Sequence, residues 1–200
     1  MRSLTVYLPF AQIMALSSTI YTFTVELSDV DRGVYESLDL RVAMHPSESP
    51  DYLATRVIAY CLEYREGIAF AAGGVSDADE PAVLARDLTG RMVSWIEVGA
   101  PDADRLHRAS KSGARVAVYS HRDLRNLLPQ WRERRIHRAE EIPVFTFDRG
   151  FIDDVAARLA RRMTWTLSLT DRHLYLDLDG TGLETTVHEV RIGNVGVLAD

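Results

Sequence analysis

The segment from Arg91 to Ser120 constrains the fold more than any other part of the chain. Residues 92–98 are mostly apolar, aromatic or β-branched, which predicts a buried strand. Asp102 is a suitable N-cap for a helix that continues to about Gly113, and a second strand is expected at 115–120. A strand, a helix and a strand in this order predict a βαβ unit with parallel strands and a right-handed crossover.

The rest of the chain alternates between patterns typical of strands and of amphipathic helices. Residues 19–27 and 34–44 predict a hairpin, and a core helix is expected from Pro50 to about Tyr64. The other expected elements are strands at 68–72 and 82–85, a helix over 121–135 interrupted near Pro129, a strand at 143–147, a helix at 151–162, and a three-stranded antiparallel meander of 163–169, 173–178 and 185–192. This pattern predicts a mixed α/β (α+β) fold.

Composition limits the class of protein. With 200 residues, 46% of them hydrophobic, the chain is long enough for one sizeable core. A net charge of −6 argues against a protein that coats nucleic acid over its whole surface, but it allows a local basic groove. The single cysteine, Cys61, excludes an internal disulfide and suits the cytoplasm. No run is long and apolar enough to span a membrane, so no membrane association is expected.

The first 13 residues are expected to be a loose N-terminal extension. Their apolar run is broken by Pro9 and Gln12, and Met14 offers an alternative start. Residues 14–200 are expected to form a single domain, because they contain no repeat and no long linker.

Four positions have side chains suited to metal-assisted chemistry. Glu48 lies at the start of the core helix, Asp79 lies in an acidic loop, and Glu97 lies near the end of the central strand. Lys111, the only lysine, lies on the helix that follows. Magnesium prefers hard oxygen ligands, and a nearby lysine can steady a hydroxide or a phosphate. On residue chemistry alone, structural roles such as a solvated turn or a helix-dipole contact remain the more common explanation.

Several motifs nevertheless resemble the YaeQ family, in order and with matching spacing from Met14 onward. They are MALSSTIY at Met14, DVDRGVYESLDL at Asp29, HPSE at His45, EGIAFAAGG at Glu66, DEP at Asp79, WIEVGAPDADRLHRASK at Trp95 and VAVYSHRD at Val116. This family resembles PD-(D/E)XK nucleases. The resemblance therefore implies a nuclease-like core, a mixed sheet flanked by helices, with an N-terminal hairpin and C-terminal antiparallel strands added to it.

The nuclease pattern implies roles for three acidic residues. The helix acid corresponds to Glu48 through HPSE, and the central strand acid corresponds to Glu97. The aspartate of the second core strand corresponds to Asp79 through DEP, with Asp87 as the rival. These acids would hold Mg²⁺ or Mn²⁺.

The expected lysine of the pattern is missing from its usual place. It should follow the strand acid by two residues, where this sequence has Gly99. In variants of the superfamily the lysine moves to the following helix, which makes Lys111 the first candidate and Arg108 the second.

Two functions are consistent with these features. The first is a Mg²⁺- or Mn²⁺-dependent nuclease or phosphodiesterase acting on nucleic acid. The second is a non-catalytic regulatory protein that binds nucleic acid or protein on a nuclease-like scaffold; Gly99 and the acidic net charge motivate it. The sequence leaves the substrate and the oligomeric state open.

Overall fold

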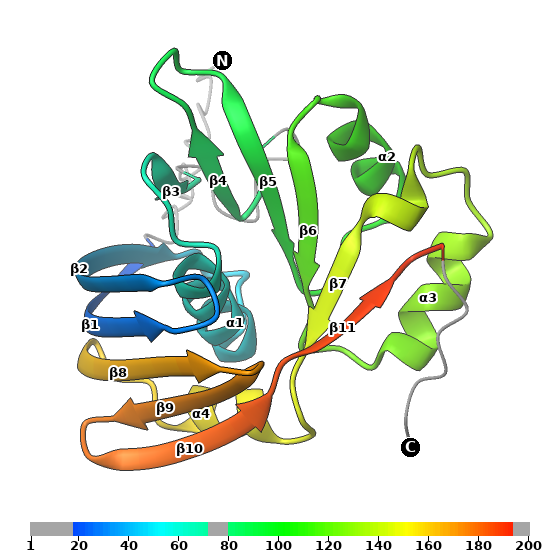
Figure 1. Cartoon of the computed structure of the whole chain (residues 1–200). Coiled ribbons are helices and arrows are strands. Elements are labelled where there is room, and N and C mark those ends of the chain that lie inside the picture. The colour runs from blue at the N-terminus through cyan, green and yellow to red at the C-terminus, as the bar shows by residue number, and fades with distance from the viewer. Residues whose placement is uncertain (1–17, 72–79, 194–200) are drawn as a thin grey trace, which may run out of the picture.

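The structure is a computed structural model that describes residues 18–71 and 80–193. Its strands form two mixed sheets that meet at helix α1 (Figure 1). The elements are β1 (Thr19–Asp29), β2 (Val34–Met44), α1 (Pro50–Leu62), β3 (Ile68–Phe70), β4 (Val83–Arg86), β5 (Met92–Val98), α2 (Ala103–Lys111), β6 (Arg115–Tyr119), α3 (Leu124–Arg132), the short 3-10 helix η2 (Ala139–Glu141), β7 (Pro143–Thr146), α4 (Phe151–Ala157), β8 (Arg162–Thr170), β9 (His173–Leu178), β10 (Thr181–Thr186) and β11 (His188–Arg191). None of the helices in these ranges has both the length and the apolar character needed to cross a membrane.

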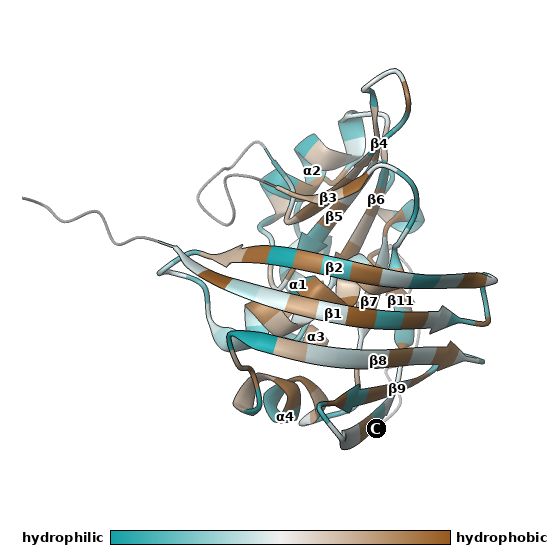
Figure 2. Ribbon diagram, turned by 90° about the vertical axis from the view of Figure 1, so that its left-hand side faces the viewer, coloured by the Kyte–Doolittle hydropathy of each residue, from teal (hydrophilic) through white to brown (hydrophobic). Residues whose placement is uncertain are grey.

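The first sheet has five strands in the order β10-β9-β8-β1-β2. The expected N-terminal hairpin forms its β1–β2 side, and the two groups of antiparallel strands are joined by a parallel pairing of β1 with β8. Along β1 the buried side chains of Phe23, Val25 and Leu27 alternate with more exposed ones, because one face of the sheet packs on the core. Figure 2 shows the same alternation of hydropathy along the strands.

The second sheet has six strands in the order β11-β7-β6-β5-β4-β3. The predicted βαβ unit is confirmed: β5 and β6 are parallel, and α2 connects them. Val116 and Val118 of β6 belong to the core shared with α2 and α3, whereas Ala117 and Tyr119 belong to the core shared with α1. Helices therefore cover both faces of this sheet, which explains why its central strands are nearly continuously apolar.

The end of the meander differs from the sequence prediction. Residues 185–192 are not one strand: β10 ends at Thr186, and β11 pairs antiparallel with β7 in the other sheet. A two-residue hairpin at Asp179 and Gly180, both with positive φ, starts the third meander strand earlier than its apolar pattern indicates. The buried Val187 lies where the chain passes from one sheet to the other.

Two helices also differ from expectation. Helix α3 is not interrupted at Pro129 but continues to Arg132, because Leu128 and Trp131 on either side are buried in the core. The proline removes one backbone donor, and the helix ends within a turn of it. Helix α4 ends at Ala157 rather than near 162, since β8 already begins at Arg162.

Candidate functional site

Glu97 lies at the end of β5 and is only 3% exposed. Its Oε1 accepts hydrogen bonds from Trp95 Nε1 at 2.6 Å and from Arg105 Nε at 2.7 Å. Arg105, in the first turn of α2, also donates to the backbone carbonyl of Glu80. Burial raises the pKa of Glu97 above its ordinary value of 4.5, although Arg105 and Trp95 oppose the rise. The carboxylate is therefore desolvated and depends on its arginine partner.

Glu48 lies just before α1 and is also buried. Arg56 pairs with it through two contacts of 3.1 Å, Nη1 to Oε1 and Nη2 to Oε2. The same guanidinium donates from Nη2 to the carbonyl of Ala43 at 2.7 Å. Burial lowers the pKa of Arg56, and the charge of Glu48 opposes this. Ser49 caps the helix through its hydroxyl, which fixes the first turn beside this ion pair.

Tyr52, in the first turn of α1, lies beside the end of β5, because its Cδ2 would be 3.6 Å from a Cβ at Gly99. Burial raises the pKa of its phenol above the ordinary value of 10.0, and Arg56 opposes the rise. The charges of Glu97 and Glu48 raise this pKa further. The Arg56 guanidinium lies 5.8 Å from the centroid of the Tyr52 ring. The start of α1 and the end of β5 thus meet at one place, which we call the carboxylate site (Glu48, Tyr52, Arg56, Glu97 and Arg105).

Gly99 follows β5 in a left-handed conformation with φ of +82°. A Cβ at this position would lie 3.4 Å from His121 Cε1 and 3.6 Å from Tyr52 Cδ2. The His121 ring is anchored by a 3.2 Å contact between its Nδ1 and the Thr55 hydroxyl. Burial lowers the pKa of His121, which favours the neutral ring at neutral pH. A histidine and a tyrosine therefore border the position at which the nuclease pattern has its lysine.

Lys111 and Arg108 lie on the exposed side of α2. Lys111 is six residues after Arg105, which places the two side chains about 120° apart around the helix. It is Arg105 that contacts Glu97, and within the described part of the chain Lys111 forms no ion pair. The roles assigned to Lys111 and Arg108 by resemblance remain predictions.

Of the two candidate aspartates, the structure describes only Asp87. Asp79 lies outside the described residues. Asp87 lies in the β4–β5 turn, where its Oδ1 accepts from the backbone N of Thr89 at 2.9 Å and its Oδ2 pairs with Arg91 Nε at 3.3 Å. That turn precedes β5, whereas Glu97 lies near the end of β5, so the fold does not bring Asp87 to Glu97. Among the residues that the structure describes, no group of three or more His, Cys, Asp or Glu side chains is arranged to hold a metal.

Comparison with known proteins connects this geometry to a family. A family model described as YaeQ protein matches residues 14–187. The chain belongs to the YaeQ family. A relative from Escherichia coli (strain K12), named "Uncharacterized protein YaeQ", is 29% identical over 175 residues, which cover 87% of this chain and 96% of the relative.

Two YaeQ crystal structures share the fold. The structure from Pseudomonas syringae has a TM-score of 0.79 and 31% sequence identity, covering 86% of this chain and 96% of its own. The structure from Xanthomonas axonopodis pv. citri has a TM-score of 0.77 and 26% identity, covering 86% of this chain and 98% of its own. These similarities confirm the mixed α+β fold of the YaeQ family.

In this YaeQ family member, sequence analysis missed the partners of the carboxylates. Arg56 and Arg105 look like ordinary helical arginines, and His121 has no recognisable ligand spacing. One signal was available: a carboxylate at the end of an apolar strand needs a cation, and the first cation on the following helix is Arg105.

Proposed function

We propose that this protein is a divalent-metal-dependent phosphodiesterase that acts on nucleic acid. The observation that carries the proposal is that the first turn of α1, which follows the buried Glu48, lies beside the end of β5, which carries the buried Glu97: Tyr52 borders Gly99. Buried carboxylates are costly to maintain, and sites of this kind occur preferentially where chemistry uses them. Mg²⁺ and Mn²⁺ bind one or two carboxylates and complete their coordination with water and substrate phosphate.

The described residues fit such a metal only in part, since they contain no group of three potential ligands. Glu97 supplies a suitable carboxylate, and Asp79 is the further ligand that the resemblance implies. The resemblance has Glu48 assist through water, which would require its enclosed pair with Arg56 to open. Since Glu97 Oε1 already accepts from Arg105, metal binding has to compete with that guanidinium. A bound ion would lower the pKa of a water molecule and polarise a phosphate.

Two side chains are candidates for accepting the proton of the attacking water. Lys111 is the candidate by resemblance, and His121 is the candidate by position because it borders Gly99. A neutral imidazole can accept a proton, and the lowered pKa of His121 favours that form at neutral pH. The two candidates are separable by mutation.

Calorimetric titration with Mn²⁺ and Mg²⁺ tests the metal site. Binding is expected in the wild type, lost in Glu97→Gln and kept in Lys111→Ala. Glu63→Gln is the matched control, because Glu63 is also a carboxylate held by an arginine, but at the other end of α1. Unchanged binding in Glu97→Gln, with the protein folded by circular dichroism, would contradict the proposal.

Cleavage of single- and double-stranded DNA and RNA in Mn²⁺ tests the activity and the proton acceptor. Loss of cleavage in His121→Asn but not in Lys111→Ala would assign the role to His121, and the reverse result would assign it to Lys111. Because both variants leave Glu97 intact, metal binding is expected to be unchanged in both.

The alternative function is a non-catalytic nucleic-acid- or protein-binding regulator. It is favoured by Gly99 at the usual lysine position and by the exposed side of α2 on which Lys111 lies. Nucleic-acid binding that weakens with salt, without cleavage in any divalent metal, would support this alternative. Either function is proposed for the cytoplasm, which the single cysteine suits.

A further inference from the structure

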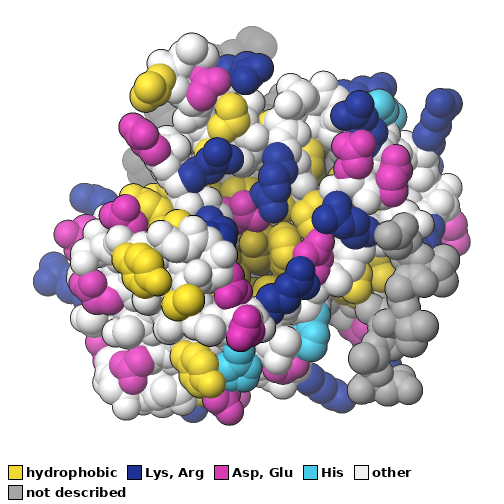
Figure 3. All heavy atoms as spheres, viewed as in Figure 1, with side chains coloured by type: hydrophobic (Ala, Val, Ile, Leu, Met, Phe, Trp, Pro, Cys, Tyr) yellow, Lys and Arg dark blue, Asp and Glu magenta, His cyan; other side chains and the backbone are white. Residues whose placement is uncertain are grey.

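A pocket of about 550 Å³ opens between the two sheets at the C-terminal end of α1. Figure 3 shows the corresponding face, on which charged side chains of both signs surround a hollow with apolar side chains inside it. The volume is within the range typical of small-molecule sites, about 300–1,000 Å³. The pocket contributes nothing to the carboxylate site, and sequence analysis did not find it.

The wall of the pocket is rich in arginine. Its lining includes four arginines but only two carboxylates, on a chain whose net charge is −6. One arginine is structural: Arg32 pairs with the fully buried Asp29 at 2.6 Å and donates to the carbonyls of Tyr64 and Cys61 at the end of α1. The other three face two carboxylates: Glu63 in the lining and Glu189, which pairs with Arg172 at 2.9 Å outside the lining.

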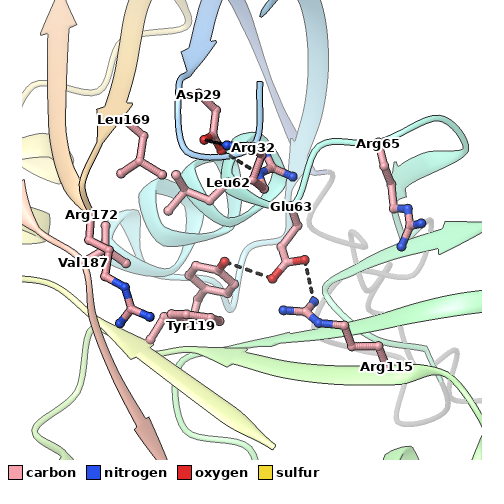
Figure 4. Close-up of a pocket in the computed structure, with 11 residues that line it drawn as sticks. Asp29, Arg32, Leu62, Glu63, Arg65, Arg115, Tyr119, Leu169, Arg172 and Val187 are labelled. Atoms are coloured by element: carbon pink, nitrogen blue, oxygen red, sulfur yellow. Dashed lines mark hydrogen bonds and ion pairs between the residues drawn. The ribbon is translucent and has the colours of Figure 1, made fainter. Parts of the chain in front are cut away.

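Figure 4 shows that these three arginines come from separate segments: Arg65 and Arg115 lie on the Glu63 side of the Tyr119 phenol, and Arg172 lies on the other side. Arg115 Nη1 contacts Glu63 Oε2 at 2.6 Å, and the Tyr119 hydroxyl donates to Glu63 Oε1 at 3.0 Å. A guanidinium has five N–H donors, so Arg115 retains donors for a ligand. The contact of Arg65 with the Ser94 hydroxyl, at 3.4 Å, is long, and the Arg65 side chain is exposed.

Arg172 is held at the pocket by a strained turn. It and Asp171 form the β8–β9 turn with φ of 63° and 52°, a conformation that residues other than glycine adopt at an energetic cost. Both backbone N–H groups donate to the Asp31 carboxylate of the β1–β2 turn, at 2.7 Å and 2.9 Å. The neighbouring hairpin therefore fixes the backbone of an arginine whose side chain remains 60% exposed.

The floor of the pocket is apolar. Tyr119 stacks on Phe145 with ring centroids 4.8 Å apart, and Leu62, Leu169 and Val187 complete the lining. An inorganic anion would leave this surface uncovered, whereas an organic phosphate has an apolar or aromatic part to place on it. Arginine suits the phosphate because its planar fork binds two phosphate oxygens at once.

We propose that this pocket binds a small organic phosphate of nucleotide size. Its phosphate group lies between Arg115 and Arg172, with Arg65 further out on the Glu63 side, and its apolar part lies on the floor. The inference is independent of the metal site. The pocket is at the opposite end of α1 from Glu48, and a helix of 13 residues is roughly 20 Å long.

Calorimetry with adenosine 5′-monophosphate tests the proposal with a matched pair of variants. Arg172 and Arg191 both pair with Glu189, at 2.9 Å and 3.0 Å, but only Arg172 lines the pocket. We expect Arg172→Ala to weaken binding at least about tenfold, because a charge-assisted contact is lost. We expect Arg191→Ala to change binding less than about twofold, since the ion pair and the 3.1 Å hydrogen bond to the Glu141 carbonyl that it removes involve no residue of the lining. Equal weakening by both variants, or no effect of Arg172→Ala, would overturn the proposal.

Two further ligands separate the contributions of the phosphate and the apolar part. Adenosine should bind more weakly than the nucleotide, and inorganic phosphate should compete with it. Adenosine binding as tightly as the nucleotide, or no binding of the nucleotide at millimolar concentration, would overturn the proposal. Glu97→Gln should leave nucleotide binding unchanged. Loss of nucleotide binding in this variant would show that the ligand binds at the carboxylate site, and it would also overturn the proposal.

Discussion

The two ends of α1 present charged side chains in opposite ways. At the N-terminal end Glu48 and Arg56 form a fully enclosed pair, with exposed side-chain fractions of 0% and 1%. At the C-terminal end Glu63 and Arg115 form a pair of similar chemistry, but their exposed fractions are 11% and 47%. Burial, rather than the type of residue, distinguishes the two pairs.

This difference matters because desolvation makes a buried pair costly to break, while water compensates for the loss of an exposed one. The enclosed pair is suited to keeping a carboxylate in one position. In the exposed pair, a ligand can replace one of the two partners with little loss of free energy. The dipole of α1 also favours these charges: Glu48 lies at its positive N-terminal end, and Arg32 contacts carbonyls at its negative C-terminal end.

The largest expected effect comes from removing one arginine at each end. Arg56→Leu should lower the free energy of unfolding by about 3–5 kcal/mol, because the Glu48 charge loses its buried partner. Arg115→Leu should lower it by about 1 kcal/mol or less, because water replaces the guanidinium. Urea unfolding followed by circular dichroism measures both, and equal losses would contradict the comparison.

A smaller effect is expected at Gly99. Gly99→Ala should cost about 1–2 kcal/mol because the left-handed backbone disfavours a side chain. Gly113→Ala is the control: its φ of +79° is similar, but a Cβ there would meet nothing within 4 Å. Because the contacts at Gly99 have ordinary lengths, the two losses should be equal in thermal unfolding. A distinctly larger loss at Gly99 would show that Tyr52 and His121 are packed too tightly to accommodate a methyl group.

The pH dependence of stability tests the environment of Glu97. Its folded-state pKa is raised, so the folded protein retains the proton more readily than the unfolded chain does. The resulting contribution to stability is fully present below the ordinary value of 4.5 and is lost as pH rises through the raised pKa. Relative to Glu97→Gln, the wild type should therefore lose stability as pH rises above 4.5. A constant difference between the two proteins across this range would contradict the assignment.

The smallest expected signal is the reaction of Cys61 with a thiol reagent. Burial raises the pKa of this thiol to about 12, and the residue is 0% exposed. The native protein at pH 8 should therefore react negligibly with 5,5′-dithiobis(2-nitrobenzoic acid), and the unfolded protein should react promptly. Rapid reaction of the folded protein would show that α1 opens between its two ends.

Sequence patterns predicted the elements of the fold better than their pairing. Alternation along 19–27 and the apolar run at 92–98 identified β1 and β5, because these patterns depend on local burial. The parallel pairing of β1 with β8 and the transfer of β11 to the second sheet were not predictable. Both depend on contacts between segments far apart in the chain, which no local pattern records.

The same limit applies to the sites. Glu97 was identifiable because a carboxylate at the end of an apolar strand is unusual, and this is visible from the sequence of one short segment. That Arg105 rather than Lys111 contacts it depends on the rotation of α2, which becomes visible only when the helix is docked. The pocket depends on Arg65, Arg115 and Arg172, three residues on separate segments that the two sheets bring together.

The strand pairings also determine how late in synthesis the two sheets can be completed. In the N-terminal hairpin, β1 gains its second neighbouring strand only after β8 has been synthesised. Likewise, β7 gains its second neighbour only after β11 has been synthesised. Until those late strands leave the ribosome, both sheets retain open edges capable of pairing with other chains. Pairings over such long sequence separations also slow folding. The nascent protein should therefore be most prone to aggregation just before its last strands emerge, and truncation before β8 should reduce the yield of soluble protein.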